Sequence, residues 1–193
     1  APSSALTQAA DAVGKIVYND RSGATFLCSG TMLNDSTTTF TPYVFTAAHC
    51  IQEAFDAETV DVYWFFRALS CGSLSVPPYA LQTGGSMLLA RSVDYDWALL
   101  RLHTMPPAGV RYSAWRAEPV PAGAIATTLH HAGGDLLMFS QGSMLGYYTF
   151  SDGSSFMQMQ WSQGTTETGS SGAGLFTFLP SGGELEVLWQ RLD

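Results

Sequence analysis

Short hydrophobic segments, separated by turn residues, recur along almost the whole chain. Residues 59–66 alternate in part between apolar and polar side chains, as a strand with one covered face should. Helical periodicity is scarce, and only residues 48–58 predict a helical turn or two. About a dozen short strands at this spacing predict an all-β protein, built as a sandwich or as barrels. The predicted strands lie within residues 14–19, 25–33, 43–47, 59–66, 86–91, 97–102, 123–130, 135–145, 147–150, 155–161, 173–179 and 185–189.

A proline-rich piece, residues 104–110, falls near the middle of the chain. The length of 193 residues is enough for one large domain or for two small barrels that share an interface. We therefore expect this piece to connect two halves of the fold. No sequence repeat relates the two halves.

Charged residues are sparse, and acidic ones prevail among them. They make up 12% of the chain, about half the usual share, as is typical of secreted all-β proteins. The net charge of −8 leaves no basic patch for phosphates, which argues against a nucleic-acid partner and suits weak attraction of cationic substrates. No apolar run is long enough to span a membrane. The first residues lack a basic start with an apolar core, so we expect a secreted, mature form that has lost its signal peptide and any propeptide.

The chain has three cysteines, Cys28, Cys50 and Cys71, without the CxxC spacing of a zinc site. One disulfide and one leftover cysteine is the natural count. A Cys28–Cys50 disulfide would close a loop of 22 residues and hold the turn that carries His49. The chain-entropy model gives such a bridge about 3 kcal/mol of stabilisation. Its role is then structural, catalytic or both.

Two residues have the types and places of a catalytic base and its partner. His49 ends a predicted strand, directly before Cys50. Asp96 directly precedes the hydrophobic segment 97–102, so its side chain is expected to be partly covered. A covered carboxylate needs a partner, and an imidazole N–H is a suitable one. Asp94 is the rival acid.

Ser170 and Ser171 lie between glycines in the segment 166–176. Such a segment holds either a nucleophile on a turn or only a flexible loop. The order along the chain is histidine, acid, serine. The α/β-hydrolases have the order serine, acid, histidine, and their G-x-S-x-G pattern fails here because Ala173 replaces the last glycine.

The segments TAAHC, DWALL and GSSGAG resemble the three triad motifs of the chymotrypsin-fold serine endopeptidases, and the chain resembles their bacterial lysyl endopeptidase branch most. The likeness runs from about residue 12 to residue 178. It implies an all-β protein of two packed antiparallel six-stranded β-barrels, residues 1–105 and residues 106–193, the second without its last strand and helix. The matching segments are 28–50, 62–71, 96–102, 123–135 and 159–172.

The resemblance also assigns roles to individual residues. Ser171 would be the nucleophile, because it is followed by glycine in the family's G-x-S-G pattern. His49 would be the general base and acid, and Asp96 would hold its imidazole. The N–H groups of Gly169 and Ser171 would form the oxyanion hole. No cofactor is implied.

Other positions depart from the related proteases. Ser170 replaces the aspartate that pairs with the new N-terminus in trypsin-type zymogens, so activation by that ion pair is excluded. Thr165 stands where trypsin has its pocket aspartate, and Glu167 matches a family glutamate that lines the substrate pocket or is an exposed turn residue. Trp189 stands where a glycine of the pocket wall is expected. Cys71 matches a cysteine whose N-terminal partner is absent here, so that partner has been removed or Cys71 is a free thiol.

Together these observations predict a secreted, monomeric serine endopeptidase that cuts proteins or peptides after basic residues, lysine over arginine. One alternative is a catalytically impaired, protease-like binding module. Another is a serine protease of different preference, specific for glutamate or small residues. A metal site at His130 and His131 is not expected, because neighbouring residues of a strand point to opposite faces.

Overall fold

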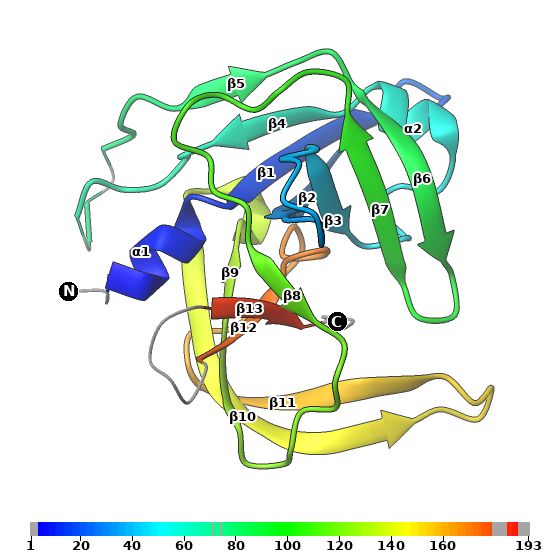
Figure 1. The fold of residues 1–193 in the computed structure, drawn as a ribbon, viewed down its shortest axis with the longest axis vertical. Coiled ribbons are helices and arrows are strands. Elements are labelled where there is room, and N and C mark those ends of the chain that lie inside the picture. Colours follow the sequence, from blue (N-terminus) through cyan, green and yellow to red (C-terminus); the bar gives the residue numbers. More distant parts are fainter. Residues whose placement is uncertain (1–3, 71, 74, 179–184, 189–193) are drawn as a thin grey trace.

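Two β-sheets, one from each half of the chain, form the body of the protein (Figure 1). The structure is a computed structural model that describes residues 4–70, 72, 73, 75–178 and 185–188. Helices are few and short, so the all-β prediction is confirmed. The predictions for Cys71 and Trp189 lie outside the described residues.

The first sheet has seven strands in the order β5-β4-β1-β2-β3-β7-β6, and all its pairings are antiparallel. Its alternation is clear in β4, where every second side chain is buried. The strands are β1 (Val13–Asn19), β2 (Thr25–Leu33), β3 (Tyr43–Thr46), β4 (Asp61–Trp64), β5 (Ala80–Gln82), β6 (Ser86–Ser92) and β7 (Trp97–Leu102).

The second sheet has six strands in the order β11-β10-β9-β12-β13-β8. Its pairings are antiparallel except for β13 with β8, which run parallel. The segments 135–145 and 147–150, predicted as two strands, form one long strand that is bulged between Met144 and Gly146. The strands are β8 (Ala114–Arg116), β9 (Ile125–His130), β10 (Met138–Thr149), β11 (Ser155–Gln163), β12 (Leu175–Phe178) and β13 (Leu185–Leu188).

Within the described residues, three short helical segments accompany the sheets. Helix α2 (Ala54–Glu58) lies inside the segment for which the sequence predicted a helical turn. Helix α1 (Ser4–Ala10) was not predicted, because seven residues with mostly alanine as apolar side chain give little periodicity. A 3₁₀ turn, η1 (Ala132–Gly134), follows β9. None of the helices in the described ranges has the length and apolar character needed to cross a membrane.

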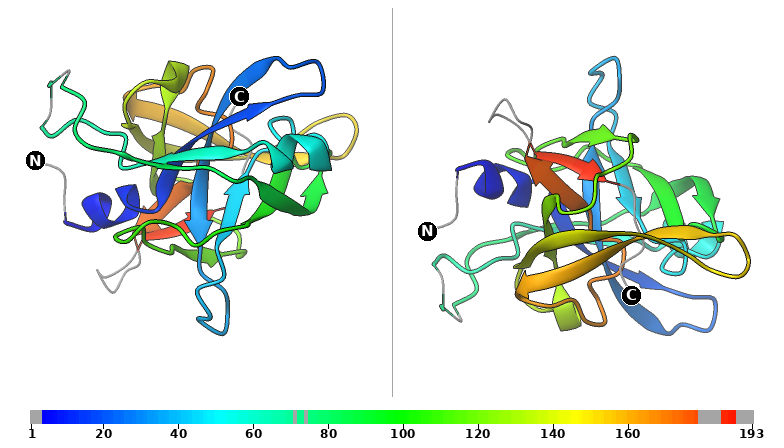
Figure 2. Two further views of the ribbon diagram at one scale, coloured as in Figure 1. Left: turned by 90° about the horizontal axis from the view of Figure 1, so that it is seen from above. Right: turned by 90° about the horizontal axis from the view of Figure 1, so that it is seen from below.

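Among the residues that the structure describes, the hydrophobic core has three parts. One fills the first sheet around Trp64, and another fills the second sheet around Leu175. A third lies between the sheets, where Phe45 and Val13 of the first half meet Phe176 of the second. This shared core fixes the two sheets against each other, so that residues from both can contribute to one site. Figure 2 shows the turns β1–β2 and β2–β3 projecting from opposite sides of this body.

Candidate active site

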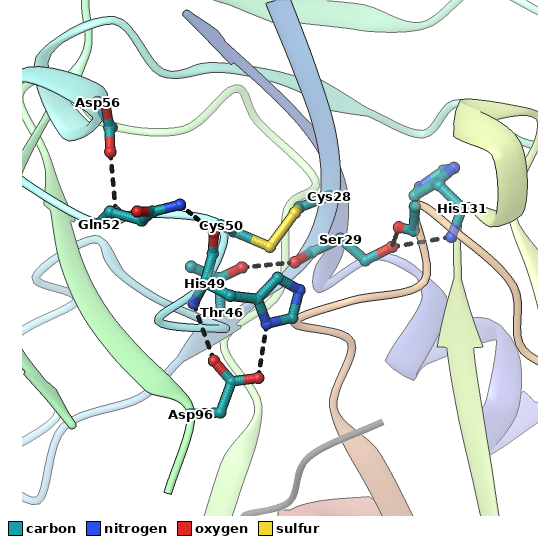
Figure 3. Close-up of a disulfide and its surroundings, with 10 residues drawn as sticks. Cys28, Ser29, Thr46, His49, Cys50, Gln52, Asp56, Asp96 and His131 are labelled. Atoms are coloured by element: carbon teal, nitrogen blue, oxygen red, sulfur yellow. Dashed lines mark hydrogen bonds and ion pairs between the residues drawn. A yellow bond between two sulfur atoms is a disulfide. The ribbon is translucent and has the colours of Figure 1, made fainter. Parts of the chain in front are cut away.

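His49 and Asp96 are brought together by the pairing of two strands in the first sheet. His49 follows β3, Asp96 immediately precedes β7, and these strands pair with Thr46 opposite Ala98. One oxygen of Asp96 accepts the backbone N–H of His49 at 2.8 Å, and the other lies 2.6 Å from Nδ1 of the ring (Figure 3). The carboxylate thus fixes both the backbone and the ring of His49.

Burial differs sharply between these two partners. The side chain of Asp96 is 8% exposed, whereas that of His49 is 50% exposed. An ionised carboxylate only accepts hydrogen bonds, so the proton lies on Nδ1 of His49 and leaves Nε2 free to accept another proton. The rival, Asp94, is exposed. The structure therefore brings Asp96, not Asp94, to the imidazole.

The predicted disulfide between Cys28 and Cys50 is confirmed. It joins β2 to the residue directly after His49, and both cysteines are buried. The cross-link therefore holds the turn that carries His49 from one side, while Asp96 holds it from the other (Figure 3).

Ser171 lies on a turn between β11 and β12, in the second half of the chain. The first sheet contacts this turn directly, because the N–H of Ser29 in β2 donates to the carbonyl of Ser171 at 2.8 Å. The Ser29 hydroxyl donates to the carbonyl of Gly169 at 2.9 Å and accepts the N–H of His131 at the same distance. Figure 3 shows Ser29 reaching toward His131. The nucleophile candidate is thus held jointly by both halves.

The hydrogen bonds of this turn fix the directions of two backbone N–H groups, those of Gly169 and Ser171. The carbonyl of Thr168 accepts from Gly133 at 2.6 Å, and the carbonyl of Ser170 accepts from Ala173 at 3.1 Å. In a trans peptide the N–H points opposite to the carbonyl, so the N–H groups of Gly169 and Ser171 point away from those partners. Within the described ranges neither N–H donates to a protein acceptor. Both are free to receive an anionic oxygen.

Glycine is required at position 169 for two reasons. Its φ of +91° lies in a region that side chains rarely adopt. A Cβ there would also lie 2.7 Å from the carbonyl oxygen of His131. The turn therefore depends on this glycine.

One pocket of about 780 Å³ is lined by residues from both halves of the chain. His49, Ser171 and Gly169 line it together. In the part of the chain that is described, no hydrogen bond joins His49 to Ser171. Such contacts are often long in a site without substrate and shorten when substrate binds.

The two residues predicted for substrate binding have exposed side chains and do not line this pocket. Their backbones fix the loop before Ser171. The carbonyl of Thr165 accepts from the Ser140 hydroxyl at 2.8 Å, and the N–H of Glu167 donates to the Ser170 hydroxyl at 3.1 Å.

Nothing in the sequence indicated that Ser29 and Ser140 help to hold the site together. The His130 ring lies between two serine hydroxyls and is fully buried. Burial lowers its pKa to about 4, and burial lowers the pKa of His131 to about 4 as well. Both rings are therefore neutral at neutral pH. The adjacent histidines were visible in the sequence and match a family motif with an expected structural role, but their hydrogen-bond partners could not be read from it. Among the described residues no group of three or more metal-ligating side chains is found.

Comparison with known proteins finds close relatives in one family. Residues 1–185 match the family described as "Lysyl endopeptidase, C-terminal domain". The curated lysyl endopeptidase of Pseudomonas aeruginosa is 34% identical over 183 residues, which cover 92% of this chain and 40% of that protein. The chain therefore spans less than half the length of this relative.

Solved protease structures share the fold. The active form of Rv3671c protease from M. tuberculosis has a TM-score of 0.60 at 16% identity, over 97% of this chain and 79% of that one. The HtrA-type protease AlgW with tripeptide has a TM-score of 0.64 at 16% identity, over 96% and 58%. At these identities the likeness concerns the fold alone, and it confirms the predicted chymotrypsin-like fold class.

Proposed function

This chain belongs to the lysyl endopeptidase family, and from that premise we propose that it is a serine endopeptidase with Ser171 as nucleophile, His49 as base and Asp96 as the partner of His49. One observation carries the proposal. His49, fixed by both oxygens of Asp96, lines the same pocket as Ser171 and Gly169, whose backbone N–H groups have no acceptor among the described residues. These are the parts that acyl transfer requires.

In the proposed reaction, Ser171 Oγ attacks the carbonyl carbon of the substrate while its proton passes to Nε2 of His49. The carbonyl oxygen becomes an anion that accepts from the N–H groups of Gly169 and Ser171. His49, now charged and stabilised by Asp96, gives its proton to the leaving amine as the C–N bond breaks. Water then attacks the acyl-enzyme by the same steps and releases the acid, with Ser171 again protonated.

For the substrate we propose peptides with a basic residue before the cut bond, lysine over arginine. The basic side chains of the chain itself support this preference. Of its eight lysine and arginine residues, only Lys15 is a lysine, although lysine is among the commonest residues in proteins. Lys15 lies inside β1 with its ammonium group 3.8 Å from the ring centre of Phe66, and it donates to the carbonyl of Gly134 at 3.1 Å. Arg21 and Arg111, in contrast, are 67% and 56% exposed.

A protease that accepts arginine would therefore find exposed cleavable residues on this chain, whereas a lysine-specific one would find only Lys15 here, in a strand paired on both sides. The net charge of −8 also favours approach of cationic peptides at low salt. Thr165 and Glu167 stay candidates for substrate contacts, because their loop leads directly to the nucleophile.

Labelling with a fluorophosphonate, followed by peptide mapping, tests the proposed nucleophile. We expect the label on Ser171 of the folded protein, and no label in Ser171→Ala or His49→Ala. A folded wild-type protein that takes no label would favour the binding-module alternative. Digestion of a mixed peptide library then tests the preference, and cuts that follow glutamate or small residues would contradict it.

We also propose that the protein acts outside the cytoplasm. The Cys28–Cys50 disulfide supports this location, because disulfides persist in oxidising compartments. Substrates there would be proteins or peptides that reach the open pocket from solvent.

A further inference from the structure

The hydroxyl of Ser170, next to the proposed nucleophile, belongs to a buried chain of hydrogen bonds. Ser170 is 2% exposed. Its Oγ lies 2.8 Å from Nδ1 of His130 and accepts the N–H of Glu167 at 3.1 Å. The side chain thus points away from the pocket and into the second sheet.

The chain of hydrogen bonds continues through His130 and returns to the loop that precedes Ser171. Nε2 of His130 lies 3.1 Å from the hydroxyl of Ser140 in β10, and that hydroxyl donates to the carbonyl of Thr165 at 2.8 Å. Ser140 and His130 are fully buried. The loop 165–170 is therefore tied at both ends to one imidazole.

Only one arrangement of protons satisfies every member. Ser140 uses its proton on the Thr165 carbonyl, so it must accept from Nε2–H of His130. Nδ1 then carries no proton and accepts from the Ser170 hydroxyl, which in turn accepts from Glu167. The ring must be neutral, and burial, by lowering the pKa of His130 to about 4, keeps it so. A carboxylate at position 170 would face this buried neutral ring, whereas a serine fits it.

This network of hydrogen bonds also fixes the backbone next to a proposed oxyanion donor, the N–H of Ser171. The N–H of Ser170 donates to the carbonyl of Glu167 at 2.9 Å, and the carbonyl of Ser170 accepts from Ala173. Fixing the Ser170 side chain therefore fixes the peptide units on both sides of it, including the one whose N–H belongs to Ser171. A freed side chain would let these peptide units rotate and misdirect their N–H groups.

We infer that His130 is a positioning residue for the nucleophile turn, by which we mean residues 165–171, which end in the proposed nucleophile Ser171. It acts through Ser170 and, by way of Ser140, through Thr165, and it touches neither substrate nor reacting atoms. The inference rests on the proposed protease function. It explains how the turn is held without an ion pair at position 170.

The test uses variants that each remove a known hydrogen bond from this network. Ser170→Ala removes the hydroxyl, and His130→Gln keeps a donor for Ser140 but loses the acceptor for Ser170. His130→Asn keeps the acceptor. With an activated lysyl ester, we expect kcat to fall at least about 10-fold in the first two variants, short of the ~10²–10³ for complete loss of an oxyanion donor. KM should change less than 2-fold or so, and His130→Asn should recover most of the lost rate.

Ser86→Ala is the matched control. Ser86 in β6 is also buried, and its hydroxyl donates to the carbonyl of Ala57 in helix α2 at 2.9 Å. Its removal should leave kcat unchanged, because this bond is remote from the nucleophile turn. Urea unfolding of every variant shows whether it is folded. If Ser170→Ala does not fold, Ser140→Ala removes the hydrogen bonds at the other end of the network and must lower kcat in its place.

The outcomes separate this inference from the proposed function. If the wild type hydrolyses the ester and Ser170→Ala and His130→Gln match Ser86→Ala in kcat and KM, the positioning role is wrong while the protease proposal stands. Equal losses in His130→Asn and His130→Gln would also overturn it, because the hydrogen bond to Ser170 would then not matter. A folded wild type without activity would overturn the proposed function and this inference with it.

Discussion

Ser29→Ala tests how the two sheets jointly hold the nucleophile turn. The Ser29 hydroxyl is buried in β2, and its two partners, the N–H of His131 and the carbonyl of Gly169, belong to the second half of the chain. Neither of these backbone groups has another hydrogen-bond partner within the described ranges. The substitution therefore leaves a buried donor and a buried acceptor unpaired.

The expected cost follows from these two groups. Each buried polar group left without a partner costs about 1–3 kcal/mol, so Ser29→Ala should lower the free energy of unfolding by about 2–6 kcal/mol. That is a large part of the ~5–15 kcal/mol of a typical protein. Ser86→Ala removes a hydroxyl of equal burial, but its acceptor, the Ala57 carbonyl, keeps the N–H of Val60. This control should therefore lose only about 0.5–1.5 kcal/mol.

Urea unfolding followed by tryptophan fluorescence measures both variants. Because Gly169 loses the bond that fixes its carbonyl, kcat of Ser29→Ala should fall as well, with the control unchanged. Two variants whose unfolding free energies agree within about 0.5 kcal/mol, both with wild-type kcat, would refute the reasoning.

Three further predictions test other parts of the account. Arg111→Lys places a lysine in the exposed connection between β7 and β8, and purified variant kept at high concentration should be cut after residue 111; mass spectrometry that finds the wild type cut there too would contradict the lysine preference. Asp96→Asn should lower kcat for an activated ester by about 10⁴, because an amide can stabilise the wrong tautomer of His49; a loss below 10-fold or so would count against the assignment. The free energy of unfolding should decrease as pH falls from 6.5 to about 4, because the unfolded chain takes up protons that folded His130 and His131, with pKa values lowered to about 4, do not. Its slope should reach at most about 1.4 kcal/mol per pH unit for each histidine, and a flat profile in urea unfolding over this range would contradict the burial of two neutral rings.

The sequence predicted those features that depend on local patterns. Alternating apolar segments indicated the strands, and the surroundings of His49, Asp96 and Ser171 marked them as candidates although they lie far apart along the chain. The Cys28–Cys50 pairing followed from their count and spacing. The strands and the disulfide are confirmed, because strand period and cysteine count can be read from neighbouring residues, whereas the catalytic roles of the three candidates stay predictions.

Features that depend on distant, ordinary residues were not predictable. Ser29 contacts Gly169 across 140 residues, and His130 contacts Ser170 across 40. A serine in a strand carries no sign of its partner, so its role appears only when the sheets are packed. The bulge that makes β10 one long strand was missed for a related reason, since a break in alternation resembles a turn.

The central claim is that Ser171 forms an acyl-enzyme with the help of His49. Stopped-flow measurement with a nitrophenyl ester of an acylated lysine tests it most directly. We predict a rapid release of about one nitrophenol per protein molecule, then slower turnover, with both phases lost in Ser171→Ala. A wild-type trace that superimposes on the Ser171→Ala trace would contradict the account.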